Sequence, residues 1–255
     1  MRFQIDKIAL ISDVHGNMPA LDIVLADIKR RGIDLIYNLG DLVGKGPSSP
    51  ATLDLCREVC QVIVRGNWDD AIVKNEESPA AAWYRAQLGA ERLAYLRDLP
   101  NSYDFRLSGK HVRLYHASAQ SEHHRVHPNS GDAELQAMFD NTPFTGLDQP
   151  LPDVAGYGDI HGAYLLPVEI GDTTKTLFNV GSVGNPLDCT LATYVILTGM
   201  LDSAAPAPLC IDFVRLPYDI DAAIAQSNQT QQPDFDAYNE ELRTGIYRHA
   251  RKKSS

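Results

Sequence analysis

The first 70 residues repeat a short apolar run that stops at a polar residue. The runs span residues 7–12, 34–39 and 61–64, and after the first of them apolar residues recur at helical spacing over 21–28. Short apolar runs that alternate with helical segments predict buried strands in a parallel sheet. Because parallel strands end at the same edge, we expect their polar stops to gather there, where open α/β sheets place their chemistry.

Beyond residue 76 the pattern changes. Residues 77–99 are rich in Ala and Leu with Arg and Glu between them, which predicts one helix or a helical pair that closes at Pro100. Strand-like segments then follow between Gly and Pro turns, at 112–115, 153–157, 175–180 and 192–201. We expect these segments to form a second sheet packed on the first, in place of a second βα domain.

The remaining segments extend this core. Residues 119–150 are polar with one helical piece near 133–139, so we expect a long insertion over one face, as in functional lids. The C-terminal part offers a strand at 209–216, amphipathic patches at 220–225 and 235–246, and a basic run at 248–253 that we expect to be a solvated end. The chain therefore predicts one α/β domain over 1–255, with a helical segment at about 77–100, an insertion at about 119–150 and a C-terminal helical extension at about 219–250.

The charge of the chain excludes one class of partner. It carries 33 Asp and Glu against 23 Lys and Arg, a formal net charge of -10. An acidic surface disfavours binding of nucleic-acid polymers. No apolar run reaches signal-peptide length at the N-terminus or the roughly 18 residues of a membrane span. We expect a cytoplasmic protein without a membrane partner, and the sequence leaves its oligomeric state open.

Five strand ends carry side chains that can bind metal. In chain order these side chains are Asp13, His15, Asp41, Asn67, His116, Asp159 and His161. Each one alone is more often a helix cap or a structural group, so the argument depends on their joint occurrence. Nitrogen and oxygen donors without a thiolate suit manganese, iron or zinc. Seven ligands suffice for two divalent ions if one carboxylate bridges them, and such a pair can turn a bridging water into a hydroxide that attacks phosphorus. The set predicts hydrolysis of a small phosphorylated substrate.

These motifs resemble those of the calcineurin-like metallophosphoesterases. In this chain they read DVHGN at 13–17, GDLV at 40–43, GNWD at 66–69, His116, and GDIH at 158–161. The segments NVGSVGNP at 179–186 and YDID at 218–221 are similar to the small single-domain bacterial and archaeal members of phosphodiesterase type. The resemblance implies a two-sheet β-sandwich flanked by helices, in four layers.

The resemblance also implies a role for each ligand. Asp13, His15 and His161 would hold one metal, Asn67, His116 and the residue at 159 the other, and Asp41 would bridge them. Position 159 departs from the family, which usually has His there. The carboxylate of Asp159 still offers oxygen ligands, and its added negative charge favours manganese over zinc.

Position 68 departs as well, because the family often has a His there that assists the leaving group. Trp68 cannot donate a proton as an imidazolium does, so another group or water must do so, or the leaving group must need no acid. His123 and His124, with His127, are candidates for this acid or for phosphate contacts beside Arg125, and a polar surface loop is the alternative for this segment.

Two more side chains are candidates for substrate binding. Trp68 can stack on a base at the pocket edge, or pack as a buried indole. Asn17 stands at the start of the first helix, where it can contact a phosphate, cap the helix, or do both.

Two functions from different classes follow. The first is a dinuclear-metal-dependent phosphoesterase, either a phosphodiesterase or a hydrolase of nucleotides or dinucleoside polyphosphates. The alternative is a catalytically impaired protein with the same fold that acts as a binding scaffold, and Trp68 and Asp159 are the departures that favour it.

Overall fold

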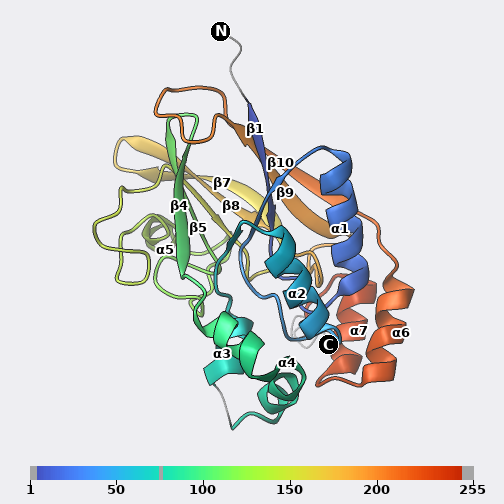
Figure 1. The fold of residues 1–255 in the computed structure, drawn as a ribbon. Coiled ribbons are helices and arrows are strands. Elements are labelled where there is room, and N and C mark those ends of the chain that lie inside the picture. The colour runs from blue at the N-terminus through green and yellow to red at the C-terminus, as the bar shows by residue number, and fades with distance from the viewer. Residues whose placement is uncertain (1–4, 75–76, 249–255) are drawn as a thin grey trace.

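Two five-stranded sheets form the centre of the molecule (Figure 1). The computed structural model describes residues 5–74 and 77–248. The first sheet has the order β10 (Cys210–Leu216), β9 (Ala192–Gly199), β1 (Asp6–Ile11), β2 (Leu35–Asn38) and β3 (Val62–Ile63). The second has the order β4 (Ser102–Leu107), β5 (Lys110–Tyr115), β6 (Val154–Tyr157), β8 (Thr173–Val180) and β7 (Ala163–Ile170). The expected two-sheet α/β sandwich is confirmed.

Helices cover the sheets from outside (Figure 1). They are α1 (Met18–Arg30), α2 (Ser49–Val59), α3 (Asn67–Lys74), α4 (Pro79–Arg97), α5 (Asp132–Ala137), α6 (Ile220–Thr230) and α7 (Phe235–Thr244). Of the two forms expected for 77–99, the pair is closer, because Gly89 at φ 72° interrupts α4. No helix within 5–74 or 77–248 is long and apolar enough to cross a membrane.

Strand β1 shows how the layers are built. Its side chains alternate between two faces, as the pleat of a strand requires. Ile8 and Leu10 belong to the apolar core between the two sheets, together with Phe105 of β4. Ala9 and Ile11 belong to the core between the first sheet and its helices. All four side chains are fully buried, so β1 is the strand on which both cores are built.

The sheet assignment of residues 192–201 was wrong. We expected this segment in the second sheet, but β9 pairs antiparallel with β1, with Leu10 opposite Val195. Strands β4 and β7 were not predicted at all. An apolar pattern shows that a strand is buried, but does not show which strand it pairs with.

The insertion packs as a layer of its own outside the second sheet. Val126, Met138 and Phe139 are buried in one cluster with Tyr157 and Leu177 of that sheet. The Tyr157 hydroxyl donates a hydrogen bond to the Val126 carbonyl at 2.8 Å. Residues 119–150 are therefore anchored by apolar contacts, and the segment that carries the clustered histidines has a defined place.

A buried carboxylate fastens α1 to the first sheet. Asp27 accepts hydrogen bonds from the Tyr194 hydroxyl of β9 at 2.7 Å, from Arg31 Nε at 2.6 Å and from Arg30. Burial disfavours the charged carboxylate, but these three donors prevail and lower the pKa of Asp27 to about 2.

We expect Asp27→Asn to lower the free energy of unfolding by about 1–2 kcal/mol at pH 7. Because the folded pKa lies below the unfolded value, the contribution of Asp27 is present above about pH 4 and is lost as the pH falls toward about 2. Urea unfolding of the variant and wild type across this range measures the difference. Asp22→Asn, at an exposed position of α1, is the control, and a pH-independent difference at Asp27 would contradict this account.

Candidate metal centre and substrate pocket

The loops that follow β1 and β2 are joined by backbone hydrogen bonds. The amide of Asp13 donates to the Gly40 carbonyl at 2.9 Å, and the amide of His15 donates to the Asp41 carbonyl at 3.0 Å. Parallel pairing of β1 with β2 continues into the loops through these bonds, so the side chains of two motifs meet.

The predicted ligands stand on unusual backbone. Five of them have φ between 47° and 63°, in the left-handed region that non-glycine residues rarely adopt: Asp13, His15, Asp41, Asp159 and His161. Backbone of this kind costs on the order of 1–3 kcal/mol for each residue and persists where the surroundings impose it, often at functional sites. The rest of the fold therefore stabilises an arrangement that is locally unfavourable.

Close approach explains the glycine of the third motif. A Cβ on Gly66 would lie 2.1 Å from Asp41 Oδ1 and 2.2 Å from the Asp41 backbone nitrogen. Asp69 of the same motif is fully buried, and its carboxylate accepts amide hydrogen bonds from Asp41 at 2.9 Å, Leu42 at 3.1 Å and Gly66 at 3.0 Å. Burial and the neighbouring Asp41 raise the pKa of Asp69 to about 7. Asp69 holds the loop of Asp41 in place, a role that the sequence analysis did not assign.

Three histidines point the same ring atom into the cluster. The Nδ1 atoms of His15, His116 and His161 lie 3.2, 2.7 and 2.5 Å from backbone carbonyl oxygens, those of Val43, Leu39 and Asn185 respectively. Each Nδ1 therefore carries the proton and donates it, which leaves the lone pair on Nε2. Metal-binding histidines are oriented by a bond of this kind.

The free Nε2 atoms face carboxylates. Asp41 Oδ2 lies 3.5 Å from Nε2 of both His15 and His116, and Asp13 Oδ1 lies 3.2 Å from Nε2 of His161. The Nε2 atoms of His15 and His161 lie 3.2 Å apart. Lone pairs so close together need a positive charge between them. Asp41 stands between two of the imidazoles, where a bridging ligand is expected.

Unpaired buried atoms test whether this set fits metal ions. Asn67 Oδ1 and His116 Nε2 are buried and form no hydrogen bond. Two groups of three donors lie with all their ligand atoms within 4.8 Å of one another: Asp13 with His15 and His161, and Asp13 with Asp41 and His116. Nitrogen and oxygen donors in this number fit divalent ions of the manganese, iron and zinc kind.

The two inner histidines respond to this negative environment in opposite ways. Burial, with Lys45 and His161 nearby, lowers the pKa of His15 well below its usual value. Burial also disfavours a charge on His116, but the carboxylates of Asp41 and Asp13 prevail and raise its pKa well above the usual value. The cluster thus favours a positive charge near His116.

Asp159 lies at the edge of the cluster. Its two oxygens accept hydrogen bonds from Arg125 at 2.8 and 2.7 Å, a bidentate ion pair. Asp159 Oδ1 is 3.4 Å from Asn67 Nδ2 and 4.0 Å from His116 Nε2. The carboxylate is therefore close to the second group of ligands, but its charge is already balanced by the insertion through Arg125.

The two candidate leaving-group acids lie apart. His123 is half exposed and its Nε2 lies 2.9 Å from Asp70, and it lines a small cavity with Asn67 and Trp68. His124, also half exposed, pairs with Glu134 at 3.3 Å. The structure thus brings His123 near Asn67 and places His124 against α5.

Trp68 and Asn17 differ in their access to substrate. Trp68 lines the main pocket, with its indole edge-on to His15 at 6.0 Å between ring centroids. Asn17 is buried; its oxygen caps α1 by accepting from the Ala20 amide, and its nitrogen donates to the Gly184 carbonyl at 2.8 Å. Both polar ends of Asn17 are thus engaged within the protein.

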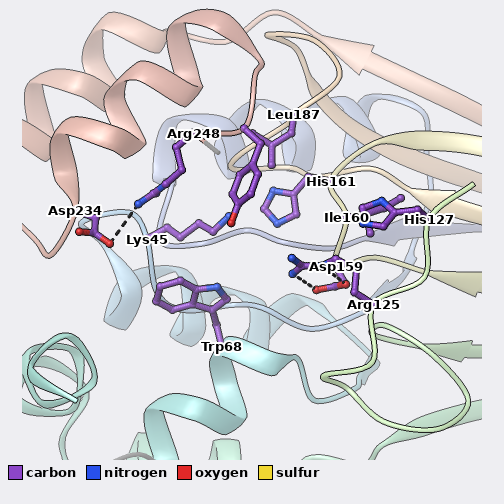
Figure 2. A pocket seen from close by; sticks show the side chains of 11 residues that line it. Lys45, Trp68, Arg125, His127, Asp159, Ile160, His161, Leu187, Asp234 and Arg248 are labelled. Carbon is purple, nitrogen blue, oxygen red and sulfur yellow. Dashed lines mark hydrogen bonds and ion pairs between the residues drawn. The ribbon is translucent and has the colours of Figure 1, made fainter. Parts of the chain in front are cut away.

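A pocket of about 450 Å³ opens beside the ligands (Figure 2). Its walls come from segments far apart in the chain: Lys45, Trp68, Arg125, His127, Asp159, Ile160, His161, Leu187, Asp234, Tyr247 and Arg248. We expected Arg248 to begin a solvated end. Arg248 instead lines the pocket, while residues 249–253 of the basic run lie outside the described residues.

Comparison with known proteins shows what the chain and its fold are similar to. A model of the calcineurin-like phosphoesterase superfamily domain matches residues 7–200. An uncharacterized protein of Methanocaldococcus jannaschii is 29% identical over 89% of this chain and 94% of its own length. The crystal structure of a metallophosphoesterase from Sphaerobacter thermophilus is 27% identical with a TM-score of 0.70, and covers 94% of this chain and 99% of that one. A hypothetical protein of Pyrococcus horikoshii, 19% identical with the same coverage, has the same fold with a TM-score of 0.71.

If the cluster holds divalent metal, we expect His161→Ala to lower the metal content of the purified protein and to reduce its thermal stabilisation by added metal, relative to the wild type. Metal analysis and thermal unfolding with and without chelator measure both effects. His124→Ala, at a half-exposed position paired with Glu134, serves as the matched control. Equal metal content in the two variants would remove His161 from the ligand set.

Proposed function

The chain belongs to the calcineurin-like phosphoesterase superfamily, and from this premise we propose that it is a dinuclear-metal-dependent hydrolase of small phosphate esters, of the phosphodiesterase or nucleotide hydrolase type. One observation carries the proposal: three imidazole Nε2 atoms and the carboxylates of Asp13 and Asp41 converge in a buried cluster, and His161 of this cluster also lines the pocket. Without a cation, this buried cluster would be strongly unfavourable.

In this proposal Asp13, His15 and His161 would hold one ion, Asn67, His116 and Asp159 would hold the other, and Asp41 would serve both. When bound, two such ions lower the pKa of water and neutralise the phosphoryl oxygens. Manganese is the proposed metal, because four of the seven ligand side chains offer oxygen, which suits it better than zinc.

The protein's own side chains prepare the site. Hydrogen bonds from Nδ1 to backbone carbonyls hold the three imidazoles in one orientation, so little reorganisation is needed when a substrate arrives. Arg125 stands on the pocket wall with its charge balanced by Asp159, and its guanidinium suits a phosphate oxygen. Trp68 adds an aromatic surface for a base or an aryl group.

The side chains near the pocket also indicate what kind of leaving group the substrate has. Trp68 stands where the family often has an imidazole, and His123 is half exposed and tied to Asp70. We therefore propose that the substrate has a good leaving group, as an aryl ester or a phosphoanhydride does. His123 is better placed than His124 to assist a poorer one.

Hydrolysis of bis(p-nitrophenyl) phosphate with added manganese tests the proposal. We expect turnover that a chelator abolishes, and a kcat for Asp41→Asn at least about 100-fold lower, because the charge between His15 and His116 is removed. Asp22→Asn, at an exposed position of α1, is the matched control. A protein that binds less than one ion per chain and shows no turnover with any divalent ion would favour the scaffold function.

The role of Asp159 as a metal ligand can be tested separately. We expect Asp159→Ala to lower the affinity for the metal at Asn67 and His116. We expect Asp159→His to keep or improve zinc binding, because imidazole is the softer ligand. Metal content measured after dialysis against manganese or zinc decides this. If both variants keep the metal content and rate of the wild type, Asp159 is not a ligand and serves only Arg125.

A further inference from the structure

Two further cations, Lys45 and Arg248, line the pocket beside the metal ligands. Figure 2 shows the Lys45 side chain running along the pocket with Arg248 above it, while His161, Asp159 and Arg125 lie on the other side. Neither cation is one of the seven predicted ligands, although Lys45 lies near Asp13 and Asp41. The place of the two cations beside the ligands indicates that the pocket receives more than one negative group.

The backbone conformation and the burial of Lys45 are both unfavourable for a lysine. Its φ is 53°, in the left-handed region, and its Nζ donates to Asn185 Oδ1 at 2.8 Å. It forms no ion pair with a carboxylate within 5–74 and 77–248. Burial lowers the pKa of Lys45, although Glu241, Asp13 and Asp41 oppose this effect. A cation held in strained backbone against an amide is available to an anionic ligand.

Arg248 is aimed by the C-terminal helical extension. Its Nε donates to Glu241 Oε1 at 2.7 Å, and Glu241 is almost fully buried on α7. Its Nη1 lies 3.2 Å from Asp234, whose side chain is 73% exposed. The buried Glu241 fixes the guanidinium, and the exposed Asp234 is a partner that a stronger anion can replace.

The extension also joins the loop of Lys45. Gln232 Nε2 donates to the Lys45 carbonyl at 3.1 Å, and a Cβ on Gly46 would lie 2.9 Å from the Tyr238 hydroxyl. The segment between α6 and α7 therefore packs on the loop that carries Lys45. Lys45 and Arg248, 203 positions apart in the chain, are thus held by a single packed unit.

The charges of the side chains that line the pocket indicate the charge of a ligand that would bind there. Arg125 pairs with Asp159, and one edge of Arg248 pairs with the buried Glu241. The groups left for an anion are Lys45, which donates to an amide oxygen, and Nη1 of Arg248, whose partner Asp234 is exposed. A pocket of about 450 Å³ has room for a second phosphate beside one at the metal ligands. A single-phosphate diester would leave both cations unused.

We propose that Lys45 and Arg248 form a second anion-binding subsite, which holds a further phosphate joined to the one at the metal ligands. The substrate class is then a phosphoanhydride, such as a nucleoside diphosphate derivative or a dinucleoside polyphosphate. This rests on the proposed function, because the first phosphate is placed by the metal ligands. The second phosphate stays bound at the cations and takes no part in bond breaking.

Binding of two simple probes tests the subsite. Methylenediphosphonate and methylphosphonate differ by one phosphonate group, and isothermal titration of the manganese-loaded protein gives the preference for the first as a ratio of Kd values. We expect this preference to fall at least about tenfold in Lys45→Gln and in Arg248→Gln. Arg243→Gln, at an exposed position of the same α7, should keep it. Chelation of manganese by the diphosphonate is common to all four proteins and cancels in the comparison.

Arg248→Gln leaves Glu241 buried without its partner, so this variant can lose binding because it unfolds. A variant that is expected to bind methylenediphosphonate more tightly avoids this ambiguity. Asp234→Asn removes the competing exposed carboxylate and preserves the left-handed φ of 59°, which Asn tolerates well. We expect methylenediphosphonate to bind about two- to threefold more tightly to this variant, with the Kd of methylphosphonate unchanged. Thermal unfolding of each variant shows which are folded.

Other outcomes overturn the subsite. The proposal is wrong if the wild-type protein shows no preference for methylenediphosphonate. It is also wrong if folded Lys45→Gln and Arg248→Gln variants retain the preference, or if Asp234→Asn binds methylenediphosphonate no more tightly than the wild type. Failure of the proposed function looks different: the preference would be present and would depend on both cations, while no phosphate ester would be hydrolysed. Turnover of bis(p-nitrophenyl) phosphate without any preference would leave the hydrolase and remove the subsite.

Discussion

Buried negative charge at the ends of β1 and β2 is the constraint on which the rest of the structure depends. Asp13 and Asp41 are almost fully buried beside imidazoles whose Nδ1 atoms are already engaged. Carboxylates in such a place are stable only with a compensating charge. Around them the protein accepts left-handed backbone at the ligands, a glycine at Gly66 and a buried Asp69 that binds three backbone amides of these loops.

The two layers outside the sheets each bring a cation to this charge. The insertion is anchored where Val126 packs against Tyr157, and it supplies Arg125. Arg125 donates hydrogen bonds to both carboxylate oxygens of Asp159. The C-terminal extension supplies Arg248, which is fixed by the buried Glu241. An Asp in place of the family's usual His at 159 adds a negative charge, and a cation from the neighbouring insertion balances it. The departure and its compensation thus belong to one local arrangement.

The pocket acquires its character from these peripheral segments. The candidate metal ligands come from the strand ends, where the sheet topology gathers them. The groups that would select a substrate come from the loop of Lys45, from Trp68 and from Arg248. In the proposed function a substrate would contact two kinds of structure, a sheet edge that would hold the reacting phosphate and outer segments that differ more readily between proteins of one fold.

From its sequence alone, the chain determined the two-sheet fold and the seven candidate ligands, because each ligand directly follows an apolar strand and its position depends on local pattern. Tertiary structure alone decided that β9 joins the first sheet, that Asp159 pairs with Arg125, and that Arg248 lies in the pocket. Local sequence does not encode these contacts. A strand's apolar pattern leaves its partner open, and a charged side chain meets its partner only when packing has brought distant segments together.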